Sequence, residues 1–192
     1  MSEQMVRGYW ANGALSFIDN HYSSSTSERL ISGLPRELRE SVAQLGPAEW
    51  CPRNQHVELL SVIASVHNDE ARAFEDLMTY GQYVGAEVTA GPLRQFMLVV
   101  TLKLFAKKLP QLWDRDHLAC GTLETDIAML DDGRLPLRLS GIQGYDHVGP
   151  AMLGWVKVAL QKFVGKTVYV KQTGWSLDQP SPREIQCEVR WS

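Results

Sequence analysis

The sequence has little charge imbalance and no long apolar run, and each absence excludes a class of protein. Its 19 Lys and Arg against 22 Asp and Glu leave a net charge of −3, which gives no general attraction for nucleic acid. The longest strongly apolar stretch, residues 96–106, is interrupted by Thr101 and Lys103. It is much shorter than the roughly 20 residues of a membrane span. We therefore expect neither a nucleic-acid partner nor a membrane-spanning segment.

Cysteine is scarce, and its number is odd. The chain has three cysteines, Cys51, Cys120 and Cys187, and no apolar segment of the secretory type follows its first residues. Disulfide frameworks usually use an even set of cysteines in an oxidising compartment. The sequence therefore predicts a cytoplasmic protein with reduced thiols.

The usual signatures of catalysis are missing as well. The sequence contains no Gly-rich phosphate loop, no G-x-S-x-G elbow, no H-E-x-x-H and no C-x-x-C. Residues 114–117 and 145–147 place acids beside histidines, but neighbouring residues in a loop more often cap helices than form an acid–base pair. We expect a protein that is not an enzyme.

What the chain does contain is a clear change of period. Residues 121–139 and 167–191 alternate apolar and polar residues, which predicts two β-hairpins, and residues 147–164 between them carry a helical stripe. In the first hairpin, a strand that reaches Met129 turns at residues 131–133. Its return strand holds Pro136, which cannot donate to a β-ladder, so we expect this strand at an edge or with the proline on its open side.

The residues before position 119 read as helices. We expect helices at 9–21, from Ser25 or Thr26 through Ile31, at 36–45, from residue 50 onward, and from residues 68–70 onward. Gly81 and Gly85 share a face of the last of these helices, which suggests close approach of another backbone, although a weakened helix end is the alternative. Residues 93–109 are apolar almost all round and predict a central buried helix that ends at Pro110.

Together these patterns predict an α+β fold. A helical half, residues 1–118, is followed by a ββ-α-ββ half, residues 119–192, within a single domain of 192 residues. Each hairpin has one apolar face and is unstable alone. A four-stranded antiparallel sheet packed on the helices buries both faces.

Four residues are weak metal candidates. Cys51 with His56, and His117 with Cys120, form two pairs that would hold zinc tetrahedrally if they met. The spacings C-x4-H and H-x2-C are loose, and a purely structural role is the alternative. We therefore assign no metal.

A second candidate site is an apolar ligand pocket. Aromatic and apolar residues lie on helices that must pack together, and such a bundle can enclose a cavity. The alternative is a filled core, because natural interiors pack without large voids. The candidate lining residues are Phe74, Tyr80, Phe96, Val100 and Trp155.

Four stretches resemble one family along nearly the whole chain, from Arg7 to Trp191. They are GLPREL at 33–38, WCP at 50–52, LRLSG at 137–141 and CEVRW at 187–191. In order and spacing they resemble the uncharacterised proteins of about 200 residues that are abundant in myxobacteria. That resemblance implies no particular activity.

More distantly, the element order is similar to a superfamily that contains haem nitric-oxide-binding domains, 4-vinyl reductase domains and TRAPP vesicle-tethering subunits. These proteins use a helical half and a ββ-α-ββ half to hold haem, a small apolar molecule, an acyl chain or a partner. The haem sensors need an axial histidine, for which His67 is the first candidate here, and a Tyr-x-Ser-x-Arg motif. Residues 145–149 have the tyrosine but lack the serine and the arginine.

Three functional hypotheses follow. The leading one is a non-enzymatic cytoplasmic sensor or adaptor that binds a small apolar ligand or a protein partner where the helical half meets the sheet. The second is an interaction or scaffold subunit without ligand, forming a homodimer or a hetero-complex. The third is a haem- or metal-binding protein that uses the residues named above.

Overall fold

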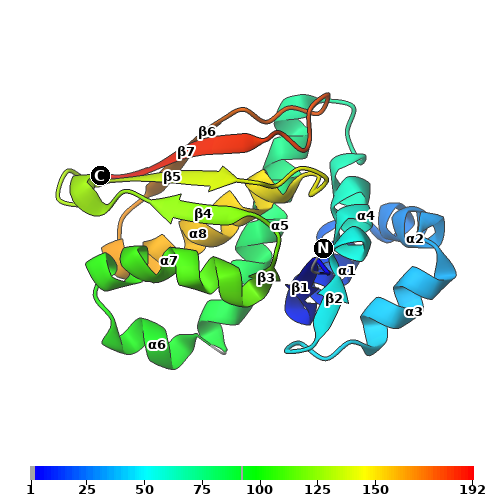
Figure 1. Ribbon diagram of the computed structural model, residues 1–192. Coiled ribbons are helices and arrows are strands. Elements are labelled where there is room, and N and C mark those ends of the chain that lie inside the picture. Colours follow the sequence, from blue (N-terminus) through cyan, green and yellow to red (C-terminus); the bar gives the residue numbers. More distant parts are fainter. Residues whose placement is uncertain (1–2, 92) are drawn as a thin grey trace.

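A computed structural model describes residues 3–91 and 93–192 and shows the predicted α+β fold (Figure 1). The strands of the C-terminal half form one antiparallel sheet in the order β4-β5-β7-β6. They are β4 (Thr122–Thr125), β5 (Arg134–Ser140), β6 (Val168–Thr173) and β7 (Glu184–Trp191). The four-stranded sheet expected from the alternating residues is confirmed.

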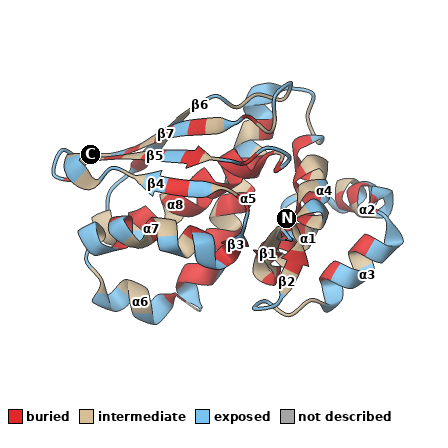
Figure 2. Ribbon diagram, in the orientation of Figure 1, coloured by how far each residue is buried: buried red, intermediate tan, exposed pale blue. Residues whose placement is uncertain are grey.

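The alternation also explains which face of the sheet is covered. Leu135, Leu137 and Leu139 of β5 are buried, and their register partners on β7 are Val189, Cys187 and Ile185. Residues between them carry charge, as in the cross-strand pair of Arg138 and Glu184. One face therefore rests on helices and the other is exposed, as Figure 2 shows.

Eight helices complete the described part of the chain, with a short 3-10 turn at Ile127–Met129. Helices α1 to α4 gather at the opposite end of the molecule from α6 and α7 in Figure 1. The helices are α1 (Gly8–His21), α2 (Ser24–Gly33), α3 (Arg36–Gln44), α4 (Arg53–Ala64), α5 (Glu70–Ala90), α6 (Arg94–Val99), α7 (Leu102–Asp116) and α8 (Val148–Val164). Among the described helices, none is both long enough and apolar enough to cross a membrane.

Helices α5 and α8 pack backbone against backbone at the centre of the molecule. A Cβ on Gly81 would collide with the carbonyl group of Ala151, and a Cβ on Gly154 would collide with the carbonyl group of Met78. A Cβ on Gly85 would lie 3.2 Å from the Cα of Trp155. The close approach suggested by Gly81 and Gly85 is therefore present, and glycine is needed on both helices to allow it.

A second sheet was not indicated by the sequence. The short strands β1 (Met5–Arg7), β2 (Trp50–Pro52) and β3 (His117–Leu118) pair antiparallel in the order β2-β1-β3. The prediction that a helix opens at residue 50 was wrong, because residues 50–52 pair with β1 and α4 begins at Arg53. The helix expected to start at Ser25 or Thr26 begins at Ser24. Ser23 is the N-cap and accepts from the amide of Thr26.

The expected central helix at 93–109 is in fact two helices. Residue Val100 is extended and separates α6, which has no buried residue, from α7. Helix α7 continues through Pro110 to Asp116. Proline removes the bond to the carbonyl four residues earlier, and here that carbonyl, of Ala106, accepts from the Thr125 hydroxyl at 3.1 Å. The substitute donor lets the helix pass the proline.

Two expectations for the first hairpin were wrong. Strand β4 ends at Thr125 and does not reach Met129, because Asp126 caps a 3-10 turn by accepting from the amide of Ala128. Strand β5 is an interior strand, so the edge position was wrong, and the alternative of an open side for Pro136 holds. The pairing of β5 with β4 ends at Leu137, so Pro136, which has no N–H to donate, lies just outside it. The Pro136 carbonyl accepts a hydrogen bond from the amide of Asp126.

Candidate functional site

The four weak metal candidates gather around strand β1. Val6 is the register partner of Cys51 on one side and of His117 on the other. The thiol of Cys120 donates to the Met5 carbonyl at 3.4 Å, and His56 follows β2 on α4. The small sheet that the sequence did not reveal is what brings the two pairs together.

His56 is fully occupied by hydrogen bonds. Its Nδ1 lies 2.7 Å from the Tyr145 hydroxyl and its Nε2 lies 2.8 Å from the Tyr80 hydroxyl. Because Tyr80 donates its proton to the Trp10 carbonyl at 2.6 Å, it accepts from His56 Nε2–H. His56 Nδ1 then accepts from Tyr145. The buried chain runs in one direction, from Tyr145 through His56 and Tyr80 to the backbone.

This arrangement does not form a metal centre within the described residues. No group of three His, Cys, Asp or Glu side chains there has metal-binding geometry. Burial raises the pKa of the Cys51 and Cys120 thiols to about 11, so both are protonated and are poor ligands and nucleophiles at neutral pH. Burial also lowers the pKa of His56 to about 3, which keeps its imidazole neutral.

His117 differs from His56, because neither of its ring nitrogens has a hydrogen-bond partner in the described part of the chain. The ring is buried and stacks on Trp113 with a centroid distance of 3.8 Å and an interplanar angle of 9°. Burial lowers its pKa to about 3, although the Trp113 carbonyl acts in the opposite direction. A neutral imidazole without partners is unusual in a protein interior.

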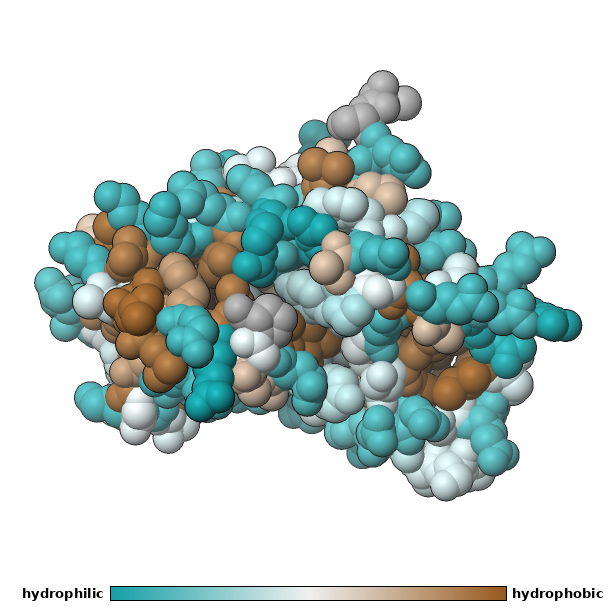
Figure 3. Space-filling model, turned by 90° about the horizontal axis from the view of Figure 1, so that it is seen from below, coloured by the Kyte–Doolittle hydropathy of each residue, from teal (hydrophilic) through white to brown (hydrophobic). Residues whose placement is uncertain are grey.

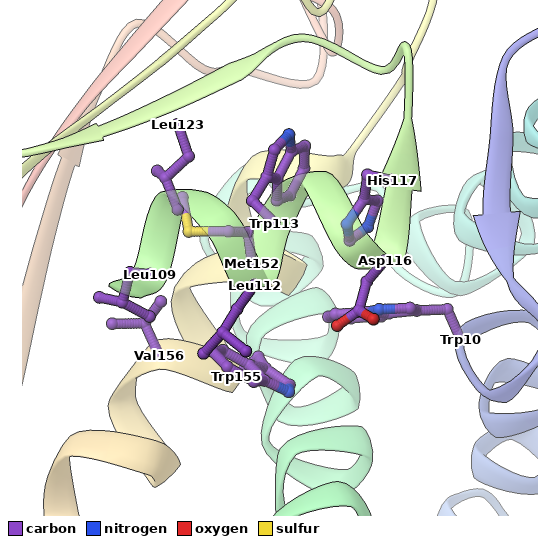
Figure 4. Close-up of a pocket in the computed structure, with 10 residues that line it drawn as sticks. All are labelled: Trp10, Leu109, Leu112, Trp113, Asp116, His117, Leu123, Met152, Trp155 and Val156. Carbon is purple, nitrogen blue, oxygen red and sulfur yellow. The ribbon is translucent and has the colours of Figure 1, made fainter. Parts of the chain in front are cut away.

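His117 lies in a small pocket where the helical half meets the ββ-α-ββ half, which we call the seam pocket (Figure 4). Its volume is about 20 Å³, close to the space that one water molecule needs. The indole Nε1 atoms of Trp10 and Trp155 are also buried without described partners. The lining residues are Trp10, Leu109, Leu112, Trp113, Asp116, His117, Leu123, Met152, Trp155 and Val156.

Asp116 closes one wall of the seam pocket. It is buried, receives two hydrogen bonds of 2.7 Å from Arg115, and accepts a hydrogen bond from the Tyr9 hydroxyl. Hydrogen bonding to Asp116 raises the pKa of Arg115. Burial is the main cause that raises the pKa of Tyr9, and the negative charge of Asp116 raises it further. Tyr9, Arg115 and Asp116 thus form one partly buried polar cluster beside His117.

The same cluster lines a larger surface groove. The groove has a volume of about 630 Å³ and lies between α1, α5, the segment before β2 and the end of α7. Its two cationic lining residues already donate hydrogen bonds within the chain. Arg7 donates to the carbonyls of Ala48 and Arg115, and Arg115 donates to Asp116. Its lining residues are Arg7, Tyr9, Asn12, Gly13, Ser16, Pro47, Ala48, Tyr83, Val84, Glu87, Val88, Gly91, Arg115 and Asp116.

The five residues predicted to line an apolar pocket lie in different places. Trp155 lines the seam pocket, and Tyr80 contacts Trp10 behind it. Phe74 packs on Trp175, whose loop joins β6 to β7. Phe96 and Val100 are half-buried around α6. The structure therefore does not gather the five residues around one pocket.

His67, the first haem candidate, lies outside the seam. It follows α4 and its Nε2 is 3.6 Å from a carboxylate oxygen of Asp76, which also accepts from the Tyr22 hydroxyl. The residues that sequence reasoning missed are Tyr9 and Asp116. Residues 114–117 were noted only as a capping stretch, and nothing local to Tyr9 indicates a partner more than a hundred positions away.

Comparisons with known proteins identify the fold. No family model matches the chain, and no curated protein matches it. Solved H-NOX structures match 97% of the chain. An H-NOX protein from K. algicida in its Fe(II) unliganded form is 10% identical over 96% of its own length, with a TM-score of 0.68. An H-NOX protein from S. oneidensis in its Fe(II)NO state is 10% identical over 99% of its own length, and its TM-score is also 0.68. The chain therefore has the H-NOX fold.

Proposed function

We propose that this protein is a non-enzymatic sensor or adaptor that binds a small, mainly apolar ligand in the groove beside the seam, without haem. The observation that carries the proposal is the position of Asp116, whose side chain lines both the groove and the seam pocket. A molecule in the groove would contact the cluster that closes the seam.

The size and chemistry of the groove support a small organic ligand. Its volume of about 630 Å³ falls within the roughly 300 to 1,000 Å³ of small-molecule sites. Pro47 and Tyr83 offer apolar surface, and Arg7 with Arg115 adds positive charge to the lining. We expect an amphipathic molecule with an apolar body and a polar head.

Contacts around Asp116 connect a ligand in the groove with the side chains of the seam pocket. Tyr9 bonds Asp116 and precedes Trp10, while Asp116 itself precedes His117. Trp10 and His117 both line the seam pocket, with ring centroids 5.3 Å apart. A ligand that moved Tyr9 or Asp116 would therefore shift side chains in the seam.

Haem is the group that the fold implies, because one of the matching solved structures probes heme distortion in the H-NOX family. The residues present do not fit it. His117 is a donor of the required kind, but the seam pocket of about 20 Å³ is far smaller than any site for a molecule of haem's size. Trp10, Trp113 and Trp155 fill the space between the halves. We therefore propose a function that uses no haem.

Groove-filling variants test the proposal. Ser16→Trp and Ala48→Trp place a large ring at exposed positions of the groove, and Ser32→Trp on α2 is a matched control away from it. We expect native mass spectrometry to detect a co-purified amphipathic molecule, or thermal-shift screening of carboxylates and phosphates with apolar tails to find one. Binding should occur in wild type and control only. A protein that binds none of them, or whose binding survives both groove variants, contradicts the proposal.

The second candidate function is an interaction subunit without ligand. The exposed apolar side chains of Leu98 and Val99 on α6 favour it. We also place the protein in the cytoplasm, because all three cysteines are buried and unpaired in the described residues. The resemblance to the myxobacterial proteins of about 200 residues adds a proposed relationship and no activity.

A further inference from the structure

Helices α6 and α7 lie in a part of the chain that carries charge of one sign. Residues 88–113 contain no Asp or Glu and four cations, which are Arg94, Lys103, Lys107 and Lys108. The protein as a whole has a net charge of −3, so this segment is charged opposite to the rest of the chain. Such a segment attracts anionic surfaces.

The same segment exposes apolar side chains that the fold does not use. Leu98 is 70% exposed, Val99 is 80% exposed and Leu104 is 42% exposed, and α6 has no buried residue. They are three of the five large apolar side chains that are exposed in the described residues. Figure 3 shows brown apolar surface at the end of the molecule where α6 lies, with teal residues beside it.

Helix α7 separates its two kinds of residue onto opposite faces. Lys103, Lys107, Leu104 and Lys108 fall within one arc at helical spacing and are exposed or half-buried. The opposite face, with Phe105, is buried toward the sheet and α8. The exposed face of α7 is therefore basic, and α7 lies at the same end of the molecule as α6 (Figure 1).

We propose that α6 and the exposed face of α7 dock on an anionic lipid surface. Exposed Leu and Val side chains suit insertion at the boundary between headgroups and acyl chains, and the flanking Lys side chains suit anionic headgroups. This contact does not depend on the ligand proposed for the groove. It is peripheral contact with a bilayer surface, which needs no spanning helix.

Two observations favour a lipid surface over a protein partner. A second copy of the chain would present the same cations to the patch, and like charges repel across an interface. A partner helix would need a groove to bind in, and neither the seam pocket nor the groove includes a residue of α6. A protruding apolar helix with a basic rim fits a flat anionic surface.

Vesicle co-sedimentation of the full chain tests the proposal. We expect binding to vesicles of phosphatidylglycerol and phosphatidylcholine, at least about tenfold weaker binding to phosphatidylcholine alone, and weakening by salt. Lys103→Gln with Lys107→Gln should weaken binding about 25-fold, since each Lys near an anionic surface contributes roughly fivefold. Leu98→Gln with Val99→Gln should weaken it at unchanged salt dependence.

Matched controls lie on the sheet. Tyr169→Gln removes another exposed apolar side chain, and Lys171→Gln with Arg183→Gln removes two exposed cations elsewhere, so both variants should bind as wild type does. Equal binding to both vesicle types, no binding to either, or patch variants that bind like the controls overturn the proposal. Light scattering that shows a dimer dissociated by Leu98→Gln with Val99→Gln also overturns it, in favour of a protein interface.

Discussion

At the residue scale, the most informative group is His56 with its two tyrosines. Every polar atom of the chain from Tyr145 to the Trp10 carbonyl has a partner, and the direction of donation is set by Tyr80. Buried polar networks of this kind stabilise a fold only when each member is satisfied. The network therefore has a structural role, and its energetics are open to measurement.

Removing the two hydroxyl groups should give unequal losses. Tyr145→Phe leaves one acceptor, His56 Nδ1, without a donor, and we expect a loss of about 1 to 3 kcal/mol of unfolding free energy. Tyr80→Phe removes two hydrogen bonds, because it leaves His56 Nε2–H without an acceptor and takes away a donor to the Trp10 carbonyl, so it should cost more. Urea denaturation measures both, with Tyr169→Phe on the surface as control. A larger loss for Tyr145→Phe contradicts the assigned direction.

Two of the three buried histidines, His56 and His117, predict how stability depends on pH. The pKa of each is lowered from 6.5 to about 3, so the unfolded chain binds more protons between these values. Their contribution is fully present above about pH 6.5 and is lost as pH falls toward 3. From pH 7 to pH 5 we expect the unfolding free energy to fall by about 2 kcal/mol per histidine.

His117→Leu separates the two contributions. An unpaired buried imidazole is costly, so Leu should leave stability at pH 7 unchanged or raise it by about 1 kcal/mol. It should also remove about 2 kcal/mol of the loss between pH 7 and pH 5. Denaturation curves of this variant at both pH values check the prediction. A variant as sensitive to pH as wild type would show that His117 is charged or exposed in solution.

At the element scale, the contact between α5 and α8 reverses the usual preference for alanine over glycine in a helix. Gly81→Ala should lower the unfolding free energy by about 3 kcal/mol or more, because the new methyl group meets backbone that cannot move alone. Gly33→Ala, also helical but with open space around it, should be neutral or stabilising by up to about 1 kcal/mol. Similar effects for the two variants in thermal and urea denaturation would contradict this packing.

The continuation of α7 through Pro110 gives a second test at this scale. Thr125→Val should cost about 1 to 3 kcal/mol, because it leaves the buried Ala106 carbonyl without a donor. In a Pro110→Ala background the backbone N–H returns, and the same change should cost less than about 0.5 kcal/mol. A double-mutant cycle measures this coupling. Equal costs in the two backgrounds would mean that Thr125 does not replace the missing donor.

These elements also show how far the sequence predicts the fold. The sheet was predictable because Leu135, Leu137 and Leu139 alternate with polar residues over a full strand. The break near Val100 was not, because residues 93–109 are apolar on every side and only tertiary contacts decide which of them are buried. The sheet around β1 was also hidden, since strands of two or three residues are too short to show a period.

At the scale of the whole molecule, the candidate site depends on contacts between distant segments. Cys51, His56, His117 and Cys120 were recognisable by type, but their meeting depends on pairing with Val6. Tyr9 lies near the start of the helical half and Asp116 near its end, and the two form a hydrogen bond. No local sequence pattern predicts such a pair. The sequence therefore predicts the residue types of the site better than its location.

The seam of this H-NOX fold is filled by its own side chains. Titration of the purified protein with hemin, followed by absorbance in the Soret region, tests it most directly. The filled seam predicts no saturable one-to-one complex, and the spectrum should stay that of free hemin in wild type and in His117→Leu alike. A stoichiometric Soret band in wild type that disappears in His117→Leu would contradict the account.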